Sequence, residues 1–260
     1  SSSATTVMVV GFVNAGLMNL YQAAGVIMGA NIGTTITGQL VALNLTALAP
    51  VFVGVGSLMV LFSKGDKTKE IGNIVLGFGI LFVGMNTMSS SMEPLAHSDG
   101  FKSAIATLSY NPLLGILAGL GLTAVVQSSS ATIGILIALG NNGLIPLQVA
   151  LPVLFGDNIG TCATALLSSI GTNKNARKAA LIHLTFNIIG TVIFTIILKP
   201  VTYIIMALNP GNIGKQIANA HTLFNIANVI IQAPFIKYLV AFVNKMIPGD
   251  GEEEHMGIQY

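Results

Sequence analysis

Residues 128–132 of this chain read SSSAT, and residues 156–161 read GDNIGT. Both stretches also occur 127 residues earlier, as SSSAT at residues 1–5 and as GANIGT at residues 29–34. Aligning the first 43 residues with the matching segment gives 18 identical positions without a gap. Many of these identities are Ser, Thr, Asn and Gly within apolar surroundings, so the repeat keeps hydrogen-bonding groups rather than apolar spacing. The repeat therefore predicts a duplicated binding site.

The composition indicates the medium in which this site lies. Hydrophobic residues make up 53% of the chain, charged residues only 8%, and the mean hydropathy is +0.80. A soluble domain carries about 25% charged residues, so this chain lacks the residues to cover a water-facing surface. The sequence has no Trp and little strand-type alternation. We therefore expect an all-α integral membrane protein rather than a barrel.

Charge and cysteine content exclude other classes of protein. The net charge of +2 carries no nucleic-acid signal, because the eleven Lys and Arg residues lie in loops or near helix ends. The single cysteine, Cys162, excludes an internal disulfide and cannot form a metal site alone. We expect Cys162 to be a small apolar helix residue.

Polar and charged stretches divide the chain into parts. The apolar segments are 4–28, 35–62, 70–92, 111–126, 131–170, 179–198 and 216–247. The predicted loops between them are 63–70, 93–110 and 171–178. We expect a first inverted repeat at 1–62, a connecting loop, scaffold helix and outer loop at 63–110, a second inverted repeat with C-terminal scaffold helices at 111–247, and an acidic tail or linker at 248–260.

The charges of equivalent loops orient the two repeats. Residues 172–178 carry three basic residues and should be cytoplasmic by the positive-inside rule. Their counterpart, residues 44–50, carries none, so we expect the two loops on opposite sides of the membrane. This is an inverted-topology repeat, which is typical of secondary transporters. The parity of crossings holds if residues 111–140 form a re-entrant hairpin and residues 146–170 form one broken transmembrane helix.

The serine stretches are the first candidate site. Residues 123–132 place a Gln and three serines inside an apolar run, and consecutive serines unwind a helix readily. A break here exposes amide N–H groups at the start of the helix at residues 131–139, where they and the helix dipole suit an anion. Carbonyl oxygens at half-helix ends suit a hard cation such as sodium. The alternative is that the serines only pack and cap against neighbouring helices.

The G-x-N-I-G-T stretches are predicted to be a second break. Two glycines and an Asn allow left-handed backbone, and Thr161 and Thr164 share one face of the following helix, close enough to share an ion. Asp157 is the only acidic residue within the apolar spans, and Ala30 occupies its repeat position. Intramembrane acids are costly and functional by default. The alternative is an Asp at a membrane–water boundary that caps a helix beginning at Asn158.

A third similarity links residues 183–187, HLTFN, with residues 221–225, HTLFN. His and Asn at positions i and i+4 share a helix face. We expect these pairs to form packing hydrogen bonds between helices rather than ligand contacts.

Together these motifs resemble the type II sodium-phosphate cotransporter family, in its bacterial branch. The resemblance is carried by the duplicated serine and G-x-N-I-G-T stretches, by NPLLG at residues 111–115, and by H-x-x-F-N from His183. It covers most of residues 1–245. It implies a sodium-coupled secondary transporter that imports inorganic phosphate by alternating access.

The resemblance also implies a set of site residues. Sodium, the co-transported ion, would bind Gln127, Ser128, Ser129, Thr161 and Thr164. From the residues themselves, apart from the resemblance, we expect a coupling or electrostatic role for Asp157, Thr34 and Thr37. Phosphate would lie among the serines and asparagines of both repeats, namely Ser1, Ser2, Ser3, Asn31, Ser129, Ser130 and Asn158.

Partners and location follow from the same resemblance. The expected partners are inorganic phosphate, sodium ions and the bilayer of the cell (plasma or inner) membrane, with no organic cofactor and no nucleic acid. Bacterial members often continue into a soluble helical domain related to phosphate-uptake regulators, and residues 250–254 would begin its linker. The family's first repeat has a Gln and a helix before the serines; by repeat logic that portion should resemble residues 70–127. The first repeat has no equivalent H-x-x-F-N after residue 37, so stoichiometry and electrogenicity are not carried over from the animal transporters.

Three other functions compete with this one. A symporter for another oxyanion or a dicarboxylate would use the same kind of site, and so would a membrane sensor that binds phosphate without moving it. An enzyme with a serine nucleophile would need a base near the serine. The candidate bases, His183 and His221, belong to the paired packing motif, so we expect no enzymatic activity.

Overall fold

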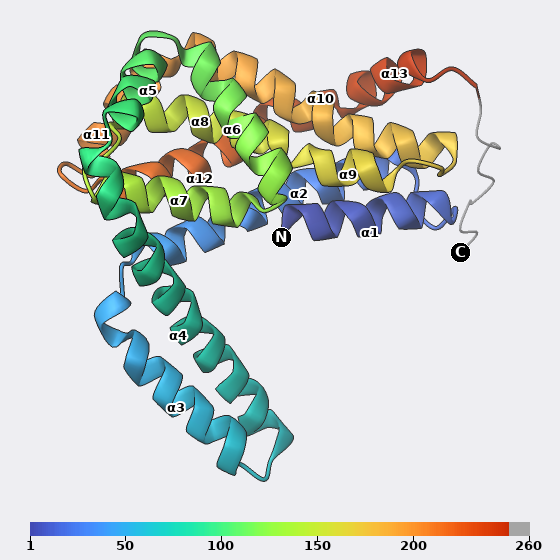
Figure 1. The fold of residues 1–260 in the computed structure, drawn as a ribbon. Coiled ribbons are helices and arrows are strands. Elements are labelled where there is room, and N and C mark those ends of the chain that lie inside the picture. The colour runs from blue at the N-terminus through green and yellow to red at the C-terminus, as the bar shows by residue number, and fades with distance from the viewer. Residues whose placement is uncertain (250–260) are drawn as a thin grey trace.

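The computed structural model describes residues 1–249, and within them the chain consists of helices and connecting turns, with no strand. The expected all-α class is confirmed. The predicted acidic tail from residue 250 onward lies outside the described residues. The helices are labelled in Figure 1 and comprise α1 Ser2–Asn14, α2 Leu20–Ala42, α3 Ala49–Phe62, α4 Asp66–Met92, α5 Asp99–Tyr110, α6 Pro112–Val126, α7 Ser129–Asn141, α8 Leu147–Gly160, α9 Cys162–Ser168, α10 Lys174–Ile196, α11 Leu198–Leu208, α12 Ile213–Gln232 and α13 Ile236–Met246, with short 3-10 turns at Thr46–Leu48, Glu93–His97 and Ala233–Phe235.

Several of these stretches are suited to a membrane. Four are long and apolar enough to cross one: Asp66–Leu95, Leu147–Ser168, Lys174–Ile196 and Ile213–Met246. A fifth results if α2 and the helix that follows it at a 76° bend are taken as one span. Helices α1, α6, α7 and α11 are apolar but have only 10–17 residues, fewer than the roughly 20 of a full crossing. This is the architecture of a multi-pass membrane protein.

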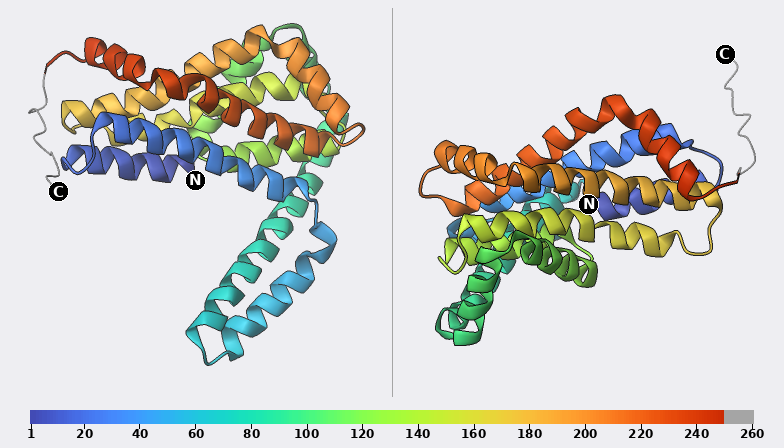
Figure 2. Two further views of the ribbon diagram at one scale, coloured as in Figure 1. Left: turned by 180° about the vertical axis from the view of Figure 1, so that it is seen from behind. Right: turned by 90° about the horizontal axis from the view of Figure 1, so that it is seen from above.

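Most helices lie along one elongated body, from which the hairpin of α3 and α4 projects (Figures 1 and 2). Helix α8 is the most enclosed element, because nearly all of its side chains are buried. Its Phe155 packs against Phe194 of α10 and Phe224 of α12, with ring centroids 5.7 and 5.3 Å away. The core thus surrounds the helix that carries the second G-x-N-I-G-T motif.

The duplication extends from the sequence to the backbone. Helices α7 and α8 begin 127 residues after α1 and α2. The turn between the paired helices contains a glycine with positive φ in both copies, 71° at Gly16 and 68° at Gly143. The turns after α2 and α9 contain a second pair of equivalent residues with positive φ, 52° at Asn44 and 79° at Gly171. Helices α1 and α7 run in opposite directions along the body (Figure 1).

Three local predictions can be compared with the observed elements. The hairpin expected at residues 111–140 is formed by α6 and α7. The break expected in G-x-N-I-G-T is wrong for the first copy, because residues 29–34 lie inside the continuous α2. In the second copy the helix is interrupted as expected, but only at Thr161, the last residue of the motif, between the end of α8 at Gly160 and the start of α9 at Cys162. The loop expected at residues 93–110 is also wrong, because it contains a 3-10 turn and α5, whose start is capped by the Ser98 hydroxyl.

Candidate functional site

The first feature of the site is the joint between α6 and α7. Gln127 ends α6 in the left-handed region, at φ 56°, and its side chain is exposed. The Ser128 hydroxyl then caps α7 by accepting the N–H of Ala131 at 3.3 Å. The predicted break at the serines is therefore confirmed, and it leaves the first amides of α7 without helical carbonyl partners.

The first repeat builds the start of α1 in the same way. The exposed Ser1 accepts the N–H of Ala4 at 3.3 Å. Ser2 and Ser3 are buried. The N–H of Ser2 donates to the Thr34 hydroxyl at 3.0 Å, which joins the serine motif of this repeat to its G-x-N-I-G-T motif.

Asp157 lies at the centre of the second repeat. Its carboxylate is fully buried, and its Oδ1 accepts the hydroxyl of Thr123, on α6, at 2.7 Å. The Thr123 hydroxyl also lies 2.9 Å from that of Thr132, on α7, whereas Asp157 Oδ2 has no hydrogen-bond partner among the described residues. A cap at the membrane–water boundary is therefore the wrong interpretation, because Asp157 lies inside α8. Thr123 and Thr132 were not among the predicted site residues, although Thr132 belongs to the repeated SSSAT.

The two equivalent asparagines contact helices outside the repeats. Asn31 Oδ1 lies 3.3 Å from Nε2 of His183, on α10. Asn158 Oδ1 accepts Nδ2 of Asn225, on α12, at 3.3 Å. One residue of each H-x-x-x-N pair, His183 and Asn225, thus forms the expected hydrogen bond to another helix, and these bonds reach the repeated motifs themselves. His221 has no hydrogen-bond partner in residues 1–249. His183 and Asn225 were missed as site residues, although the similarity of their two segments was the signal for them.

The predicted sodium residues lie on adjoining elements. The close approach of α6 to α8 places the joint between α8 and α9 against the last turns of α6: a Cβ on Gly160 would lie 2.6 Å from the carbonyl oxygen of Leu120. The Thr161 hydroxyl donates to the carbonyl of Asp157 at 2.9 Å. The Thr164 hydroxyl is buried without a partner in residues 1–249. Of the other predicted site residues, Ser129 is buried, Ser128 and Ser130 are half-buried, and Thr37 is half-buried on α2.

Within residues 1–249, the buried side-chain N and O atoms that lack a hydrogen-bond partner are confined to these motifs. A buried polar group without a hydrogen bond costs about 1–3 kcal/mol, so such atoms usually mark positions that a ligand, ion or water satisfies. All those found in residues 1–249 lie in the G-x-N-I-G-T-x-x-T motifs or the H-x-x-x-N pairs, on Asn31, Asp157, Thr164, His183, Asn187, His221 and Asn225.

Comparison with known proteins gives consistent matches. The family model described as Na+/Pi-cotransporter matches residues 1–90 and 80–246. "Uncharacterized protein YqeW" from Bacillus subtilis (strain 168) is 30% identical over 248 residues, which are 95% of this chain and 80% of that protein. "Putative inorganic phosphate export protein YjbB" from Escherichia coli (strain K12) is 26% identical over 256 residues, which are 97% of this chain and 46% of that protein.

A shorter match is to "Sodium-dependent phosphate transport protein 2C" from Homo sapiens, 40% identical over 88 residues, or 32% of this chain and 15% of that protein. The chain thus spans less than half the length of the Escherichia coli and human relatives. No solved structure matches it.

Proposed function

Because this chain belongs to the Na+/Pi-cotransporter family, we propose that it carries inorganic phosphate across the cell membrane together with sodium, by alternating access. We propose uptake, because sodium moving down an inward gradient would draw phosphate in with it. The name of one relative indicates export by that protein, so the test must measure both directions.

The observation that carries this proposal is the set of partnerless polar atoms in the repeated motifs and H-x-x-x-N pairs. Burying a polar atom in an apolar helix bundle costs free energy unless the atom forms a hydrogen bond or binds an ion. A bound substrate or ion would supply that partner. Amide and imidazole N–H groups can donate to phosphate oxygens, and hydroxyl, amide and carboxylate oxygens can bind sodium. The guests that fit are thus an oxyanion and a hard cation.

We place phosphate near the starts of α1 and α7, where free amide N–H groups and the positive ends of the helix dipoles attract an anion. The predicted residues Ser1, Ser2, Ser3, Ser129 and Ser130 lie in these first turns. Asn31 and Asn158 would add amide contacts from α2 and α8. The opposite directions of α1 and α7 support an inverted-topology repeat, in which both helices begin near the middle of the membrane.

We place sodium at the joint of α6, α7, α8 and α9. Gln127, Ser128, Ser129, Thr161 and Thr164 would supply neutral oxygens there. Asp157 Oδ2, without a partner in the described chain, would supply a negative charge that has no counterpart in the first repeat. Thr34 and Thr37 would hold the corresponding positions on α2.

We further propose that a phosphate-regulator-like soluble domain follows the membrane part.

The test is uptake of labelled phosphate into proteoliposomes under an inward sodium gradient, with choline as the replacement cation. We expect sodium-dependent uptake, and we expect Ser129→Ala and Thr164→Val to reduce it at least tenfold, as does the loss of one or two buried hydrogen bonds. Thr107→Val is the matched control, because its exposed hydroxyl only bonds within α5. Normal uptake by both site variants would refute the assignment.

The same vesicles separate the other candidates. Inhibition by arsenate but not by sulfate or succinate favours phosphate over other oxyanions and dicarboxylates. Tight binding of phosphate without accumulation would instead indicate a sensor. Release from loaded vesicles that is driven by sodium in the opposite direction would reverse the proposed direction.

A further inference from the structure

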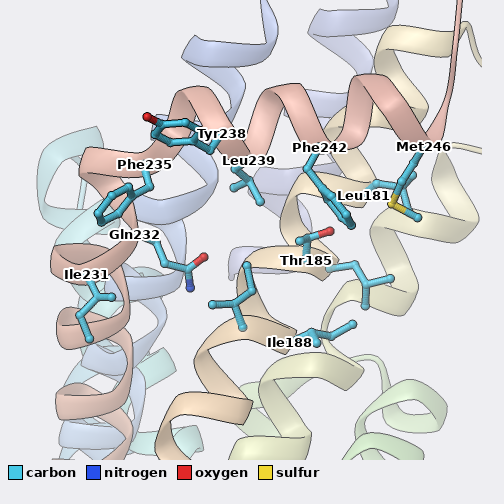
Figure 3. Close-up of a pocket in the computed structure, with 12 residues that line it drawn as sticks. Leu181, Thr185, Ile188, Ile231, Gln232, Phe235, Tyr238, Leu239, Phe242 and Met246 are labelled. Atoms are coloured by element: carbon cyan, nitrogen blue, oxygen red, sulfur yellow. The ribbon is translucent and has the colours of Figure 1, made fainter.

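A large apolar pocket lies on the side of the body. Helix α10 forms one wall of it, and the last residues of α12 together with α13 form the other. Its volume is about 680 Å³. Figure 3 shows Leu181 and Met246 at one end of it and Ile231 at the other. We call it the α10–α13 pocket. None of the phosphate and sodium residues discussed above lines it.

The sequence explains why the pocket forms. Helix α12 ends at Gln232, and the 3-10 turn that contains Pro234 precedes α13, because proline cannot donate the helical hydrogen bond. One face of α13 is buried through Leu239, Val240 and Val243. The neighbouring face, with Tyr238 and Phe242, is left as a wall of the pocket.

The lining is suited to hydrocarbon rather than to a polar solute. Among its lining residues only Thr185, Gln232 and Tyr238 carry polar side-chain atoms. The amide of Gln232 already donates to the carbonyl of Phe186 at 2.9 Å. From Leu181 to Ile189 the α10 wall is about 12 Å long at 1.5 Å per residue, close to the roughly 15 Å of one leaflet's hydrocarbon. An acyl chain matches both the chemistry and the length.

One end of the pocket is basic. Lys174, Arg177 and Lys178 lie in the first turns of α10, and Lys245 lies in the last turn of α13. The two helix ends are joined by hydrogen bonds from Lys174 to the carbonyl of Pro248 at 3.2 Å and from Lys178 to that of Gly249 at 3.5 Å. Lys178 is only 5% exposed and lies one turn before Leu181. No Asp or Glu occurs in the sequence from residue 158 to residue 249.

We propose that the α10–α13 pocket binds an anionic phospholipid, with an acyl chain between α10 and α13 and its phosphate against Lys174, Arg177, Lys178 and Lys245. Clustered basic residues at the cytoplasmic ends of transmembrane helices attract anionic lipids, and the positive-inside rule places this end in that leaflet. A zwitterionic lipid fits the apolar part equally well but lacks the net charge that the four cations select.

The absence of Trp from the chain makes the test direct. In Phe242→Trp the reporter lies in the pocket, and in Tyr203→Trp an exposed aromatic residue of α11 provides the control. Each variant is reconstituted in phosphatidylcholine vesicles that contain a small fraction of brominated phosphatidylglycerol or brominated phosphatidylcholine, and quenching is measured. Tyr238→Trp serves as a second reporter, so that a folding failure of one variant does not decide the result.

We expect the pocket reporters to show at least a tenfold preference for phosphatidylglycerol, because two of the four basic residues, at about 1 kcal/mol each near an anionic surface, already exceed the roughly 1.4 kcal/mol of a tenfold ratio. The control reporter should show little preference. Lys178→Gln combined with Lys245→Gln should reduce the preference at least tenfold, whereas Lys199→Gln combined with Lys215→Gln should retain it. Equal quenching of the pocket reporters by both lipids, or a preference that the first pair leaves unchanged, would overturn the proposal. A preference that millimolar inorganic phosphate removes would also overturn the proposal. So would the finding that a second copy of the chain, or the acidic residues 250–254, occupies the pocket in place of the lipid.

Discussion

At the scale of single residues, Asp157 distinguishes the two halves of the duplicated site. Its Oδ1 accepts the Thr123 hydroxyl, while its Oδ2 has no partner in the described chain. Burying a carboxylate is costly unless it is paired, and a bound sodium ion would pair it. Ala30 at the equivalent position of the first repeat cannot do so.

Removing the negative charge of Asp157 should therefore weaken the activation of transport by sodium while leaving the protein folded. Asp157→Asn keeps an acceptor for Thr123 but removes the negative charge. We expect the sodium concentration for half-maximal phosphate transport to rise about tenfold, the loss of one charged contact. The measurement is the sodium dependence of uptake, with Asp99→Asn at the exposed start of α5 as control. An unchanged sodium dependence in Asp157→Asn would exclude a role for the carboxylate in sodium binding.

The contact between Thr123 and Asp157 should also matter for stability. Thr123→Val leaves the carboxylate without its donor, and we expect a loss of about 1–3 kcal/mol of unfolding free energy, measured by thermal unfolding in detergent. In the Asp157→Asn background the loss should be smaller, because a neutral amide is less costly to leave unpaired. Equal losses in the two backgrounds would show that the hydroxyl acts only through packing.

At the scale of elements, α6 and α8 pack closely because each carries two glycines four residues apart. These are Gly115 and Gly119 on α6 and Gly156 and Gly160 on α8. A Cβ on Gly119 would overlap the carbonyl oxygen of Val153, and a Cβ on Gly156 would overlap that of Ile116. Small residues at this spacing let membrane helices approach closely. The approach brings Thr123 of α6 to Asp157 of α8.

Two alanine substitutions within α6 separate this packing from helix propensity. Gly119→Ala should destabilise the protein by roughly 1–3 kcal/mol through overpacking and should reduce transport as the Thr123 contact shifts. Gly121→Ala should be neutral or stabilising, because its Cβ meets no atom within 4 Å and alanine favours a helix. Both are compared by thermal unfolding and uptake. Similar behaviour of the two variants would mean that the α6–α8 contact is not tight.

These same glycines explain what could be predicted from the sequence and what could not. The all-helical class and the break at the serines follow from hydropathy and from local side-chain chemistry, which the sequence carries directly. The glycines of G-x-N-I-G-T were interpreted as chain breaks, yet Gly156 and Gly160 are helical and face α6. Their role depends on a helix 40 residues away in sequence, which local reasoning does not reveal. For the same reason the contacts of His183 and Asn225 with the repeated asparagines were missed.

At the scale of the whole molecule, the two repeats are oriented in opposite directions along the elongated body. Helices α1 and α7 run in opposite directions (Figure 1), so equivalent loops lie toward opposite ends of the body. Ala47 and Lys174 are both exposed and are 127 residues apart. They are therefore equivalent positions on which the proposed topology can be tested.

A membrane-impermeant maleimide added to right-side-out vesicles should label Ala47→Cys and leave Lys174→Cys unmodified; inside-out vesicles should give the opposite result. The native Cys162 is fully buried and provides the background without an added cysteine. Labelling of both positions from one side would contradict the inverted topology.

The central claim, that one duplicated site couples phosphate to sodium, is tested most directly by reversing only the sodium gradient across proteoliposomes with equal phosphate on both sides. We predict that an inward sodium gradient raises the internal phosphate concentration above the external one and that an outward gradient lowers it below. A phosphate distribution that is the same under both gradients would contradict the account.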